Sequence, residues 1–349
     1  MVEKTDSLSF ITCNNRRIPR VPTELVFADR LGGWKARWGI NRMKYLVEPG
    51  LYAVGNPDAD SVVLVSANYK LSFDALRKQL SGLDAWLMVL DTKGVNVWCA
   101  AGKGTFGTDE IVRRIELVKL EKIVNHRRII VPQLAAPGVA AHEVKKRCGF
   151  SVVYGPVRAA DIIAFIEAGM KATEAMRRVR FSLHDRLVLT PMEFVMGAKY
   201  LVFSVALLFI LAGLSAAGYS SDLAVKNGVR SAVNLLAAYL GGTVVGPVLL
   251  PWLPGRSFSF KGCFVGVVVG VVLMLLKLTG GRLETIAWVL LVAAVASFAT
   301  MNFTGASTYT SLSGVKKEVR VALPLQVIAA VLGAGMWVAS RFADGTIRI

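Results

Sequence analysis

The sequence predicts an α/β Rossmann-like domain with a mostly parallel sheet, followed by an all-α transmembrane domain of five helices. Between about residues 46 and 170, short runs rich in β-branched residues alternate with helical stretches. This alternation is typical of a parallel sheet covered by helices on both faces. Five apolar stretches follow, each with the roughly 20 residues that span a hydrocarbon core. The 54% share of hydrophobic residues and the mean hydropathy of +0.51 agree with a membrane portion.

We therefore expect four segments along the chain. A basic N-terminal extension, residues 1–45, packs on the α/β domain of residues 46–170. A basic juxtamembrane linker, residues 171–195, then leads into the transmembrane domain, residues 196–349. Within the extension, Trp34 and Trp38 stand one helical turn apart and are expected to pack the segment down. Its cations leave a second interpretation open, a docking surface for an acidic electron carrier.

The α/β domain is expected to place its connecting loops on one rim. The expected strands are 61–65, 83–90, 128–131 and 151–154, and the expected helices are 73–81, 109–122, 139–147 and 160–169. Ligands of open α/β sheets bind outside the carboxyl ends of the strands. The loops 66–72, 91–103, 131–138 and 155–159 should therefore meet there. They are rich in Gly, Ala, Ser and Pro, which suits a macrocycle but also suits ordinary loops.

The apolar stretches predict membrane spans near 198–218, 232–253, 262–279, 284–305 and 321–341. Gly262, Gly266 and Gly270 share one helix face, which favours close helix packing. The deep parts of the spans carry no Asp, Glu, Lys or Arg, which argues against an ion pump or proton-coupled transporter. The basic segment before the first span predicts a multi-pass protein of the cytoplasmic (inner) membrane, with the α/β domain in the cytoplasm and the C-terminus outside.

Charge and cysteine content exclude some classes of protein. The net charge of +17 is not gathered in one dense tract with interleaved aromatic residues. We therefore expect an anionic membrane surface or an acidic protein as the partner, and no nucleic acid. Cys13, Cys99, Cys148 and Cys263 have no C-x-x-C spacing, which argues against a zinc or iron–sulfur site. The lack of G-x-G-x-x-G after a strand and of a Walker loop argues against a nucleotide site.

The segment from Asn96 to Lys103, Asn-Val-Trp-Cys-Ala-Ala-Gly-Lys, is the candidate for the chemistry. Asn96 can cap a short helix, which would place Cys99 near its first turn, where a thiolate is favoured. Ala100 and Ala101 would leave one side of the helix bare for a broad, flat ligand. Taken alone, however, a single cysteine in an alanine-rich turn is more often a small buried hydrophobe.

These eight residues resemble the cap-helix motif of the membrane-anchored mercury-methylating corrinoid proteins, the HgcA family. The segments 29–39, 48–55, 133–139 and 154–159 also resemble that family. The later segments are similar to the large subunit of corrinoid iron–sulfur proteins as well. The octet and the membrane tail together separate the two families.

The resemblance implies a cobalamin-type corrinoid cofactor, with Cys99 as the catalytic residue and the lower axial ligand of cobalt. By match to the family's pattern, Ser66 and Ser72 would hydrogen-bond the periphery of the ring. Val97, Trp98 and Ala159 would line the corrin. The other implied cofactor-binding residues are Asn96, Ala100, Ala101, Gly102, Lys103, Gly155 and Pro156. A cation that closes the helix explains Lys103 equally well, and Asn96 is better explained as a cap than as a direct contact.

The resemblance further implies a corrinoid-dependent methyltransferase that transfers a methyl group from cobalt to Hg(II) and forms methylmercury. A thiolate ligand is a soft, strong donor that pushes electron density towards the methyl group. The implied partners are the Hg(II) substrate, a ferredoxin-like iron–sulfur protein that reduces the corrinoid, a methyl donor protein or methyl-folate, and the lipid bilayer. Two alternatives stay open: a membrane-tethered corrinoid methyl carrier of one-carbon metabolism, and a non-enzymatic membrane scaffold with an α/β domain.

Overall fold

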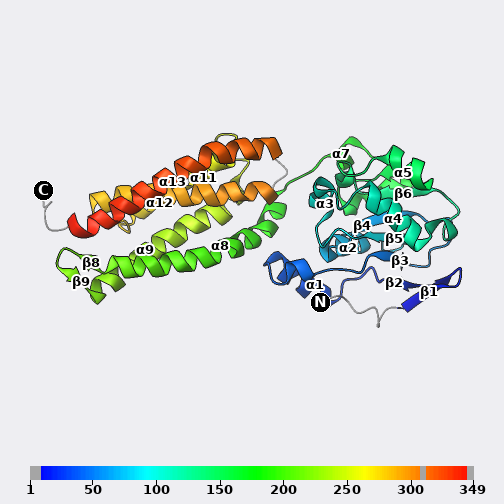
Figure 1. Ribbon diagram of the computed structural model, residues 1–349, viewed down its shortest axis with the longest axis horizontal. Coiled ribbons are helices and arrows are strands. Elements are labelled where there is room, and N and C mark those ends of the chain that lie inside the picture. The colour runs from blue at the N-terminus through cyan, green and yellow to red at the C-terminus, as the bar shows by residue number, and fades with distance from the viewer. Residues whose placement is uncertain (1–8, 307–311, 344–349) are drawn as a thin grey trace. The chain divides into compact units, whose positions relative to one another are not determined.

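The computed structural model describes residues 9–306 and 312–343. The chain divides into two compact units, which we call unit 1 (Met1–Arg180) and unit 2 (Phe181–Ile349). Figure 1 shows the mixed α/β structure of unit 1 and the long helices of unit 2. Residues 1–8 of the expected extension, and the C-terminus that we expect outside the membrane, lie beyond the described residues.

Unit 1 contains a seven-stranded, mostly parallel sheet in the order β1-β2-β3-β5-β4-β6-β7. Its strands are β1 (Ser9–Cys13), β2 (Arg16–Arg20), β3 (Gly50–Val54), β4 (Val63–Ala67), β5 (Ala85–Leu90), β6 (Arg128–Val131) and β7 (Ser151–Tyr154). Strand pairs β2/β3, β4/β5, β4/β6 and β6/β7 are parallel, whereas β1/β2 and β3/β5 are antiparallel. The predicted fold class of this part of the chain is confirmed.

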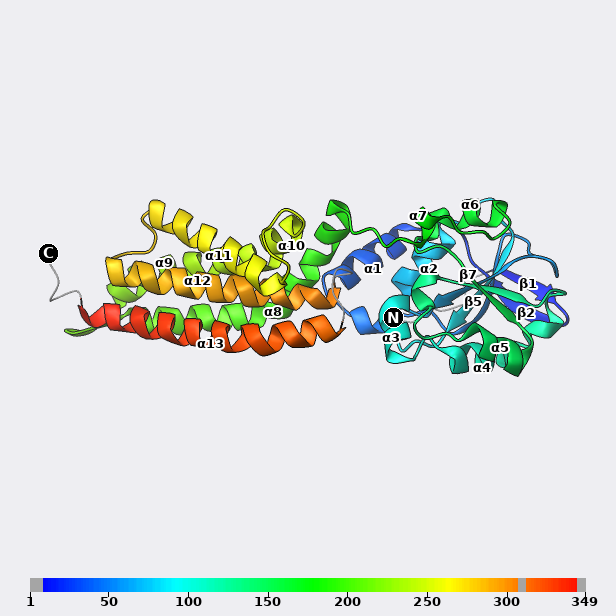
Figure 2. The ribbon, with the colours of Figure 1, turned by 90° about the horizontal axis from the view of Figure 1, so that it is seen from above.

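Helices cover both faces of this sheet (Figure 2). They are α1 (Phe27–Arg37), α2 (Lys70–Arg77), α3 (Val97–Lys103), α4 (Thr108–Val118), α5 (Ala141–Cys148), α6 (Ile162–Glu167) and α7 (Glu174–Arg177), with short turns at Arg42–Lys44 (η2), Leu120–Lys122 (η3), Gln133–Ala135 (η4) and Ala159–Asp161 (η5). One apolar core joins the sheet to α3, α4 and α5, and the other joins it to α2 and α6. Every residue of β4 and β5 is buried, which explains their continuous apolar sequences.

The first 45 residues contain elements that the sequence analysis did not predict. Strands β1 and β2 form a hairpin that extends the sheet through the pairing of Arg20 with Ala53. Asn14 and Asn15 form its turn with φ of 47° and 60°, the left-handed conformation that a two-residue hairpin turn needs. Asparagine tolerates this conformation well, so this pair was a readable hairpin signal.

Helix α1 also differs from the expectation. The prediction that Trp34 and Trp38 pack this segment down is wrong for Trp34, whose side chain is 54% exposed, whereas Trp38 is half-buried. The helix packs instead through Asp29, Gly33 and Ala36, which are buried.

Unit 2 confirms the five predicted helices that are long and apolar enough to cross a membrane. The candidate spans are Leu183–Ala212 (α8), Ser221–Leu249 (α9 Ser221–Leu240, the π-helical turn η6 Gly241–Val245 and α10 Gly246–Leu249), Phe258–Leu275 (α11), Arg282–Asn302 (α12) and Ser313–Ala343, within α13 (Leu312–Ala343). A short hairpin, β8 (Leu214–Ser215) and β9 (Gly218–Tyr219), joins α8 to α9, and the turn η7 (Phe303–Ala306) follows α12. Helix α8 starts inside the segment expected as a linker, with Ser182 and Asp185 forming a capping box.

Glycines bring the helices of unit 2 close together. A Cβ atom on Gly266 of α11 would lie 2.6 Å from Cα of Ala293 on α12. A Cβ atom on Gly242 would lie 2.6 Å from Cβ of Ala299, also on α12. Such close approach is what small residues allow between helices in lipid, where packing rather than the hydrophobic effect drives association.

Unit 2 also buries a group of three charges. Glu284, in the first turn of α12, lies 2.5 Å from Nη2 of Arg341 and 3.0 Å from Nη2 of Arg230. Glu284 and Arg341 are both buried. The three residues come from α12, α13 and α9, so this cluster ties three helices together near one end of α12.

Candidate functional site

A cavity of about 340 Å³ lies at the point where the strand order of the sheet reverses. From β4 the chain passes to β5 on one side and then crosses to β6 on the other side. Such a reversal opens a crevice at the carboxyl ends of the strands, where open α/β sheets bind ligands. The cavity is lined by residues of β4, β6 and the loops that follow them. It is the candidate site of unit 1.

Seven of the thirteen residues that the sequence analysis implied for the cofactor line this cavity: Ser72, Asn96, Val97, Trp98, Gly155, Pro156 and Ala159. They come from α2, from the start of α3 and from the loop after β7, which are distant in sequence. The remaining lining is mostly aliphatic, with Arg158 as its charged member. An apolar cavity with a few convergent polar groups is typical of cofactor sites.

Helix α3 begins and ends where its sequence predicts. Oδ1 of Asn96 accepts a hydrogen bond from the backbone N–H of Cys99 at 2.9 Å, which caps the first turn. Gly104 ends the helix with φ of 80°, the left-handed conformation of a C-terminal glycine. The predicted cap helix is therefore confirmed as a structural element. Cys99 and Trp98 are both half-buried on it.

The face of α3 that was expected to be bare is covered by the chain itself. Ala100 is fully buried and Ala101 is 3% exposed, and both belong to the core under α3. A Cβ atom on Gly138 would lie 2.8 Å from the carbonyl oxygen of Ala101, so the segment after β6 packs directly on this face. Backbone therefore approaches Ala101 closely, where a small residue is needed. A ligand can reach α3 from the side of Trp98, which lines the cavity.

The other implied residues lie around the cavity without lining it. Ser66 is buried within β4, and Cys99 lies next to the lining residue Trp98 on the first turn of α3. Gly102 and Lys103 are exposed at the end of α3. Among the described residues there is no group of three or more His, Cys, Asp or Glu side chains that could hold a metal ion.

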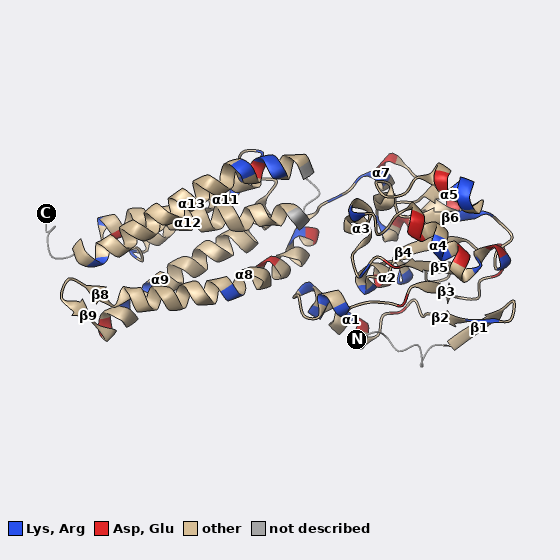
Figure 3. Ribbon diagram, in the orientation of Figure 1, with Lys and Arg blue, Asp and Glu red and all other residues tan. Residues whose placement is uncertain are grey.

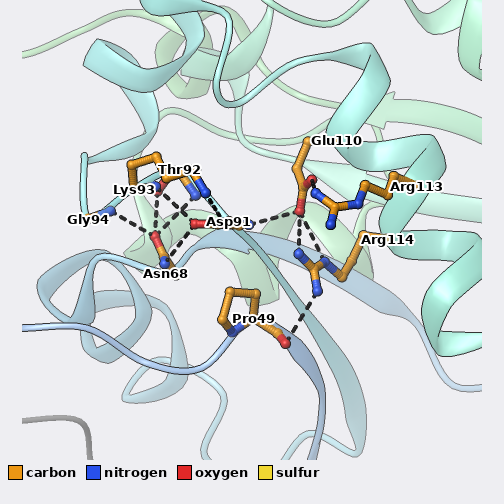
Figure 4. A network of polar contacts seen from close by, with 9 residues as sticks. All are labelled: Pro49, Asn68, Asp91, Thr92, Lys93, Gly94, Glu110, Arg113 and Arg114. Atoms are coloured by element: carbon orange, nitrogen blue, oxygen red, sulfur yellow. Dashed lines mark hydrogen bonds and ion pairs between the residues drawn. The ribbon is translucent and has the colours of Figure 1, made fainter.

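A polar network holds the loop between β5 and α3, and the sequence analysis missed it (Figure 4). Oδ1 of Asn68, directly after β4, accepts hydrogen bonds from the backbone N–H of Thr92, from that of Gly94 and from Oγ1 of Thr92. The side-chain amide of Asn68 donates to Asp91 at 3.3 Å. The sequence signal for this network was Asn68, a single amide side chain at the carboxyl end of a buried strand.

The same loop is anchored from α4. Oε1 of Glu110 accepts a hydrogen bond from the backbone N–H of Asp91 at 2.9 Å and lies 2.5 Å from Nη2 of Arg114. Arg114 also donates to the carbonyl oxygen of Pro49. Burial would raise the pKa of Asp91, but hydrogen bonds from the side chain and backbone of Lys93 outweigh it and hold the pKa below its usual range. Asp91 therefore remains a charged anchor.

Comparisons with known proteins cover this part of unit 1. Residues 41–166 match the family described as CdhD, the CO dehydrogenase/acetyl-CoA synthase delta subunit. The gamma subunits of the acetyl-CoA decarbonylase/synthase complex from Archaeoglobus fulgidus and Methanopyrus kandleri are each 33% identical over 123 residues, 35% of this chain. That of Methanocaldococcus jannaschii is 33% identical over 116 residues.

These matches involve only part of each protein. The chain spans about a quarter of the length of the curated relatives that it matches, 26% for the first two. The matched residues include α2, α3 and the loop after β7, and therefore every side chain of the cavity described above. Unit 1 thus contains a domain like that of the corrinoid iron–sulfur proteins.

Proposed function

We propose that the protein is a membrane-anchored, corrinoid-dependent methyltransferase that transfers a methyl group from cobalt to Hg(II) and forms methylmercury. The observation that carries the proposal is the position of α3. This helix brings Trp98 into the cavity at the strand-order reversal and holds Cys99 beside it. The octet of α3 is also the motif by which the chain resembles the mercury-methylating family.

The residues around the cavity fit a corrinoid. A corrin is a broad, apolar macrocycle with polar groups at its edge. The cavity offers aliphatic side chains from β4 and β6, the indole of Trp98, and hydroxyl and amide groups at Ser72 and Asn96. Gly155, Pro156 and Ala159 present little side chain on the opposite loop, which leaves room for a flat ring. Small and aliphatic walls with few polar groups are what such a ligand needs.

The roles proposed for the chain's own residues follow from this arrangement. Cys99 would supply a soft sulfur donor that could hold the cobalt of a bound corrinoid, and Asn96 fixes the turn that carries it. Val97 and Trp98 would exclude water and Ser72 would hold the periphery of the ring, whereas Ser66 is buried behind the cavity wall in β4. Ala100 and Ala101 keep α3 tight against the segment after β6, and Gly102 and Lys103 end the helix. A bound corrinoid would supply the cobalt–carbon chemistry from which a methyl group with carbanion or radical character can be transferred to Hg(II).

The proposal includes partners and a location. An iron–sulfur protein of ferredoxin type would supply the electrons that restore the corrinoid, and a methyl donor protein or methyl-folate would supply the next methyl group. The five candidate spans would hold the protein in the cytoplasmic membrane, with unit 1 in the cytoplasm and the C-terminus outside. The basic residues just before α8 favour this orientation.

A second candidate is a membrane-tethered methyl carrier of one-carbon metabolism. The matches to subunits of the CO dehydrogenase/acetyl-CoA synthase and acetyl-CoA decarbonylase/synthase systems favour it. In this case the cavity and the corrinoid would be the same, and only the methyl acceptor would differ. Hg(II) would then be an incidental substrate.

The test is spectroscopy of the full chain in nanodiscs, reconstituted with a corrinoid without oxygen. Cys99→Ala should still bind the corrinoid but lose the absorption and EPR features of a sulfur-ligated cobalt. Cys148→Ala is the matched control, because Cys148 is also a half-buried thiol of unit 1, at the end of α5. It should behave like the wild type.

Three results would decide between the candidates. A sulfur signature that Cys99→Ala alone removes, together with methylmercury formed from a methyl-loaded protein, supports the proposal. A methyl group that leaves only for a folate-type carrier, and not for Hg(II), supports the second candidate. If the full chain binds no corrinoid, both are wrong and the membrane scaffold becomes the better interpretation.

A further inference from the structure

Helix α1 has its polarity reversed relative to an ordinary surface helix. Its buried side carries the carboxylate of Asp29, which is 6% exposed. Its outward side carries Phe27, Leu31 and Trp34, which are 78%, 36% and 54% exposed. These three residues are spaced by four and three positions and therefore form one stripe along the helix. Unit 1 thus presents an unpartnered apolar stripe to its surroundings.

Buried ion pairs hold α1 in this orientation. Asp29 lies 2.8 Å from Nζ of Lys70 and 2.7 Å from Nη2 of Arg77, both on α2. Arg77 also donates to the carbonyl oxygen of Pro22 at 2.6 Å, just ahead of α1. Rolling the helix to bury its apolar stripe would expose these contacts and leave charges unpaired, which is costly. The outward stripe is therefore a fixed feature of the fold.

Cations flank the stripe on both sides. At 100° per residue, Arg30 and Arg37 lie along one border of the apolar face and Lys35 along the other, and all three are exposed. The turn η2 continues the surface with Met43, 62% exposed, and Lys44. Asp29 is the only acidic residue from position 27 to 44, and it faces inward. Figure 3 shows these cations on and after α1.

We infer that α1 and η2, residues 27–44, dock unit 1 onto an anionic lipid surface. Aromatic and aliphatic side chains on one helix face, bordered by Lys and Arg, are the signature of a helix that lies in the headgroup region. Each cation adds attraction to anionic lipid. Unit 1 ends at Arg180 and the candidate span α8 begins at Leu183, so the chain itself would keep unit 1 near any bilayer that α8 crosses.

Docking would also orient the candidate site. A Cβ atom on Gly94, in the loop that leads to α3, would lie 3.3 Å from the carbonyl oxygen of Met43 and 2.6 Å from Cδ2 of Leu46. Residues 43–46 therefore support the rim from which α3 starts. A docked α1 would therefore bring this rim close to the headgroups.

The test is photo-cross-linking of the full chain in nanodiscs, with p-benzoylphenylalanine replacing Phe27. In phosphatidylglycerol mixed with phosphatidylcholine, position 27 should form lipid adducts. In phosphatidylcholine alone the yield should fall several-fold. The matched control carries the photoreactive residue in place of Leu117, an apolar side chain on α4 that is also exposed, at 56%. This position should form almost no lipid adducts in either membrane.

The second measurement tests the cations that border the stripe, by replacing each of them with an uncharged residue. Arg30→Gln, Lys35→Gln and Arg37→Gln should each lower the ratio of docked to undocked protein by about five-fold in the anionic nanodisc. Arg113→Gln, Lys145→Gln and Lys146→Gln, which remove three exposed cations from α4 and α5 of the same unit, should leave the ratio unchanged. Circular dichroism would confirm that both sets of variants remain folded.

Three outcomes would overturn the inference. The first is an equal yield of lipid adducts at positions 27 and 117. The second is that position 27 cross-links to a second copy of the chain or to unit 2 in place of lipid. The third is that lipid adducts form at position 27 only after an acidic iron–sulfur protein is removed. The last would identify α1 as a protein-docking surface. None of these measurements involves a corrinoid or Hg(II), so they stand apart from the proposed function.

Discussion

The backbone N–H of Cys99 points at Oδ1 of Asn96 and donates to it across 2.9 Å. This bond satisfies one of the free N–H groups of the first turn of α3 and fixes the residue on which the proposed chemistry depends. The capping group and the sulfur are three residues apart, so removing the cap tests the support of Cys99 without touching its side chain.

We expect Asn96→Ala to loosen α3. An N-terminal cap contributes about 1 kcal/mol, so the amides of α3 should exchange with deuterium about five-fold faster. Asn96→Asp keeps the acceptor and should exchange like the wild type. Thr173→Ala removes the cap of α7 in the same unit and should affect α7 alone. Equal exchange in Asn96→Ala and the wild type would show that packing alone holds α3.

The buried ion pairs of Asp29 with Lys70 and Arg77 predict that the protein loses stability at acid pH. Burial raises the pKa of Asp29, but the hydrogen bond and charge of Lys70, together with Arg77, outweigh it and hold the pKa below the ordinary value of 3.8. The charged form therefore stabilises the folded state above pH 3.8, and this contribution is lost as the pH falls through the folded pKa. Burial raises the pKa of the neighbouring Asp74 in spite of Lys70 and Arg77, so Asp74 takes up its proton first.

Asp29→Asn should remove this contribution at neutral pH. Leaving Lys70 and Arg77 without one of their two buried carboxylates should cost about 3 kcal/mol and increase proteolysis of residues 22–44. Below pH 3.8 the wild type should lose further protection from proteolysis, whereas Asp29→Asn should not. Asp109→Asn breaks an exposed pair with Arg147 and should change neither quantity. Unchanged proteolysis in Asp29→Asn would mean that α1 is held by its apolar contacts.

The charge cluster of unit 2 predicts a sensitive position at the start of α12. Glu284→Gln keeps the shape of the side chain but leaves the guanidinium groups of Arg230 and Arg341 without a counter-charge. We expect a loss of about 3 kcal/mol, seen as a lower midpoint of thermal unfolding in detergent. Glu174→Gln, in an exposed pair with Arg178, is the control and should leave the midpoint unchanged. A midpoint that rises in Glu284→Gln would contradict the stabilising role of the cluster.

Glycine packing predicts where unit 2 tolerates no side chain. Gly266→Val would push into the backbone of Ala293 and should destabilise the contact between α11 and α12 by about 3 kcal/mol. Gly335→Val is the matched control, because a Cβ atom on Gly335 of α13 meets nothing within 4 Å. The comparison is made by the yield of monodisperse protein after extraction. Similar yields for both variants would show that α11 and α12 are not closely packed.

The features that were predicted correctly are those set by short stretches of the sequence. The hydrophobic lengths indicated the five candidate spans, and Asn96 marked the start of α3. The alternation of strands and helices was enough to place the loops after β4, β6 and β7 on one rim, and the cavity now joins them. These features are set by residues that are close together in the sequence, so one sequence is enough to predict them.

The features that escaped prediction depend on distant residues. Asp29 is buried because Lys70 and Arg77 lie 41 and 48 positions further along the chain, and no local pattern reports such a partner. Strand β3 is antiparallel to β5 and parallel to β2, which neither strand's composition reveals. The alanines of α3 suggested a bare face because the glycine that packs on Ala101, Gly138, belongs to another segment.

The network around Asn68 has a consequence for how a ligand would come and go. Residues 91–96 are held by Asn68, Glu110 and the backbone, all of them groups of the chain itself. Binding to a preorganised loop avoids the entropy cost of ordering it. A bound ligand could therefore leave and be replaced without refolding of the protein around the site, and the empty protein would keep the same loop shape.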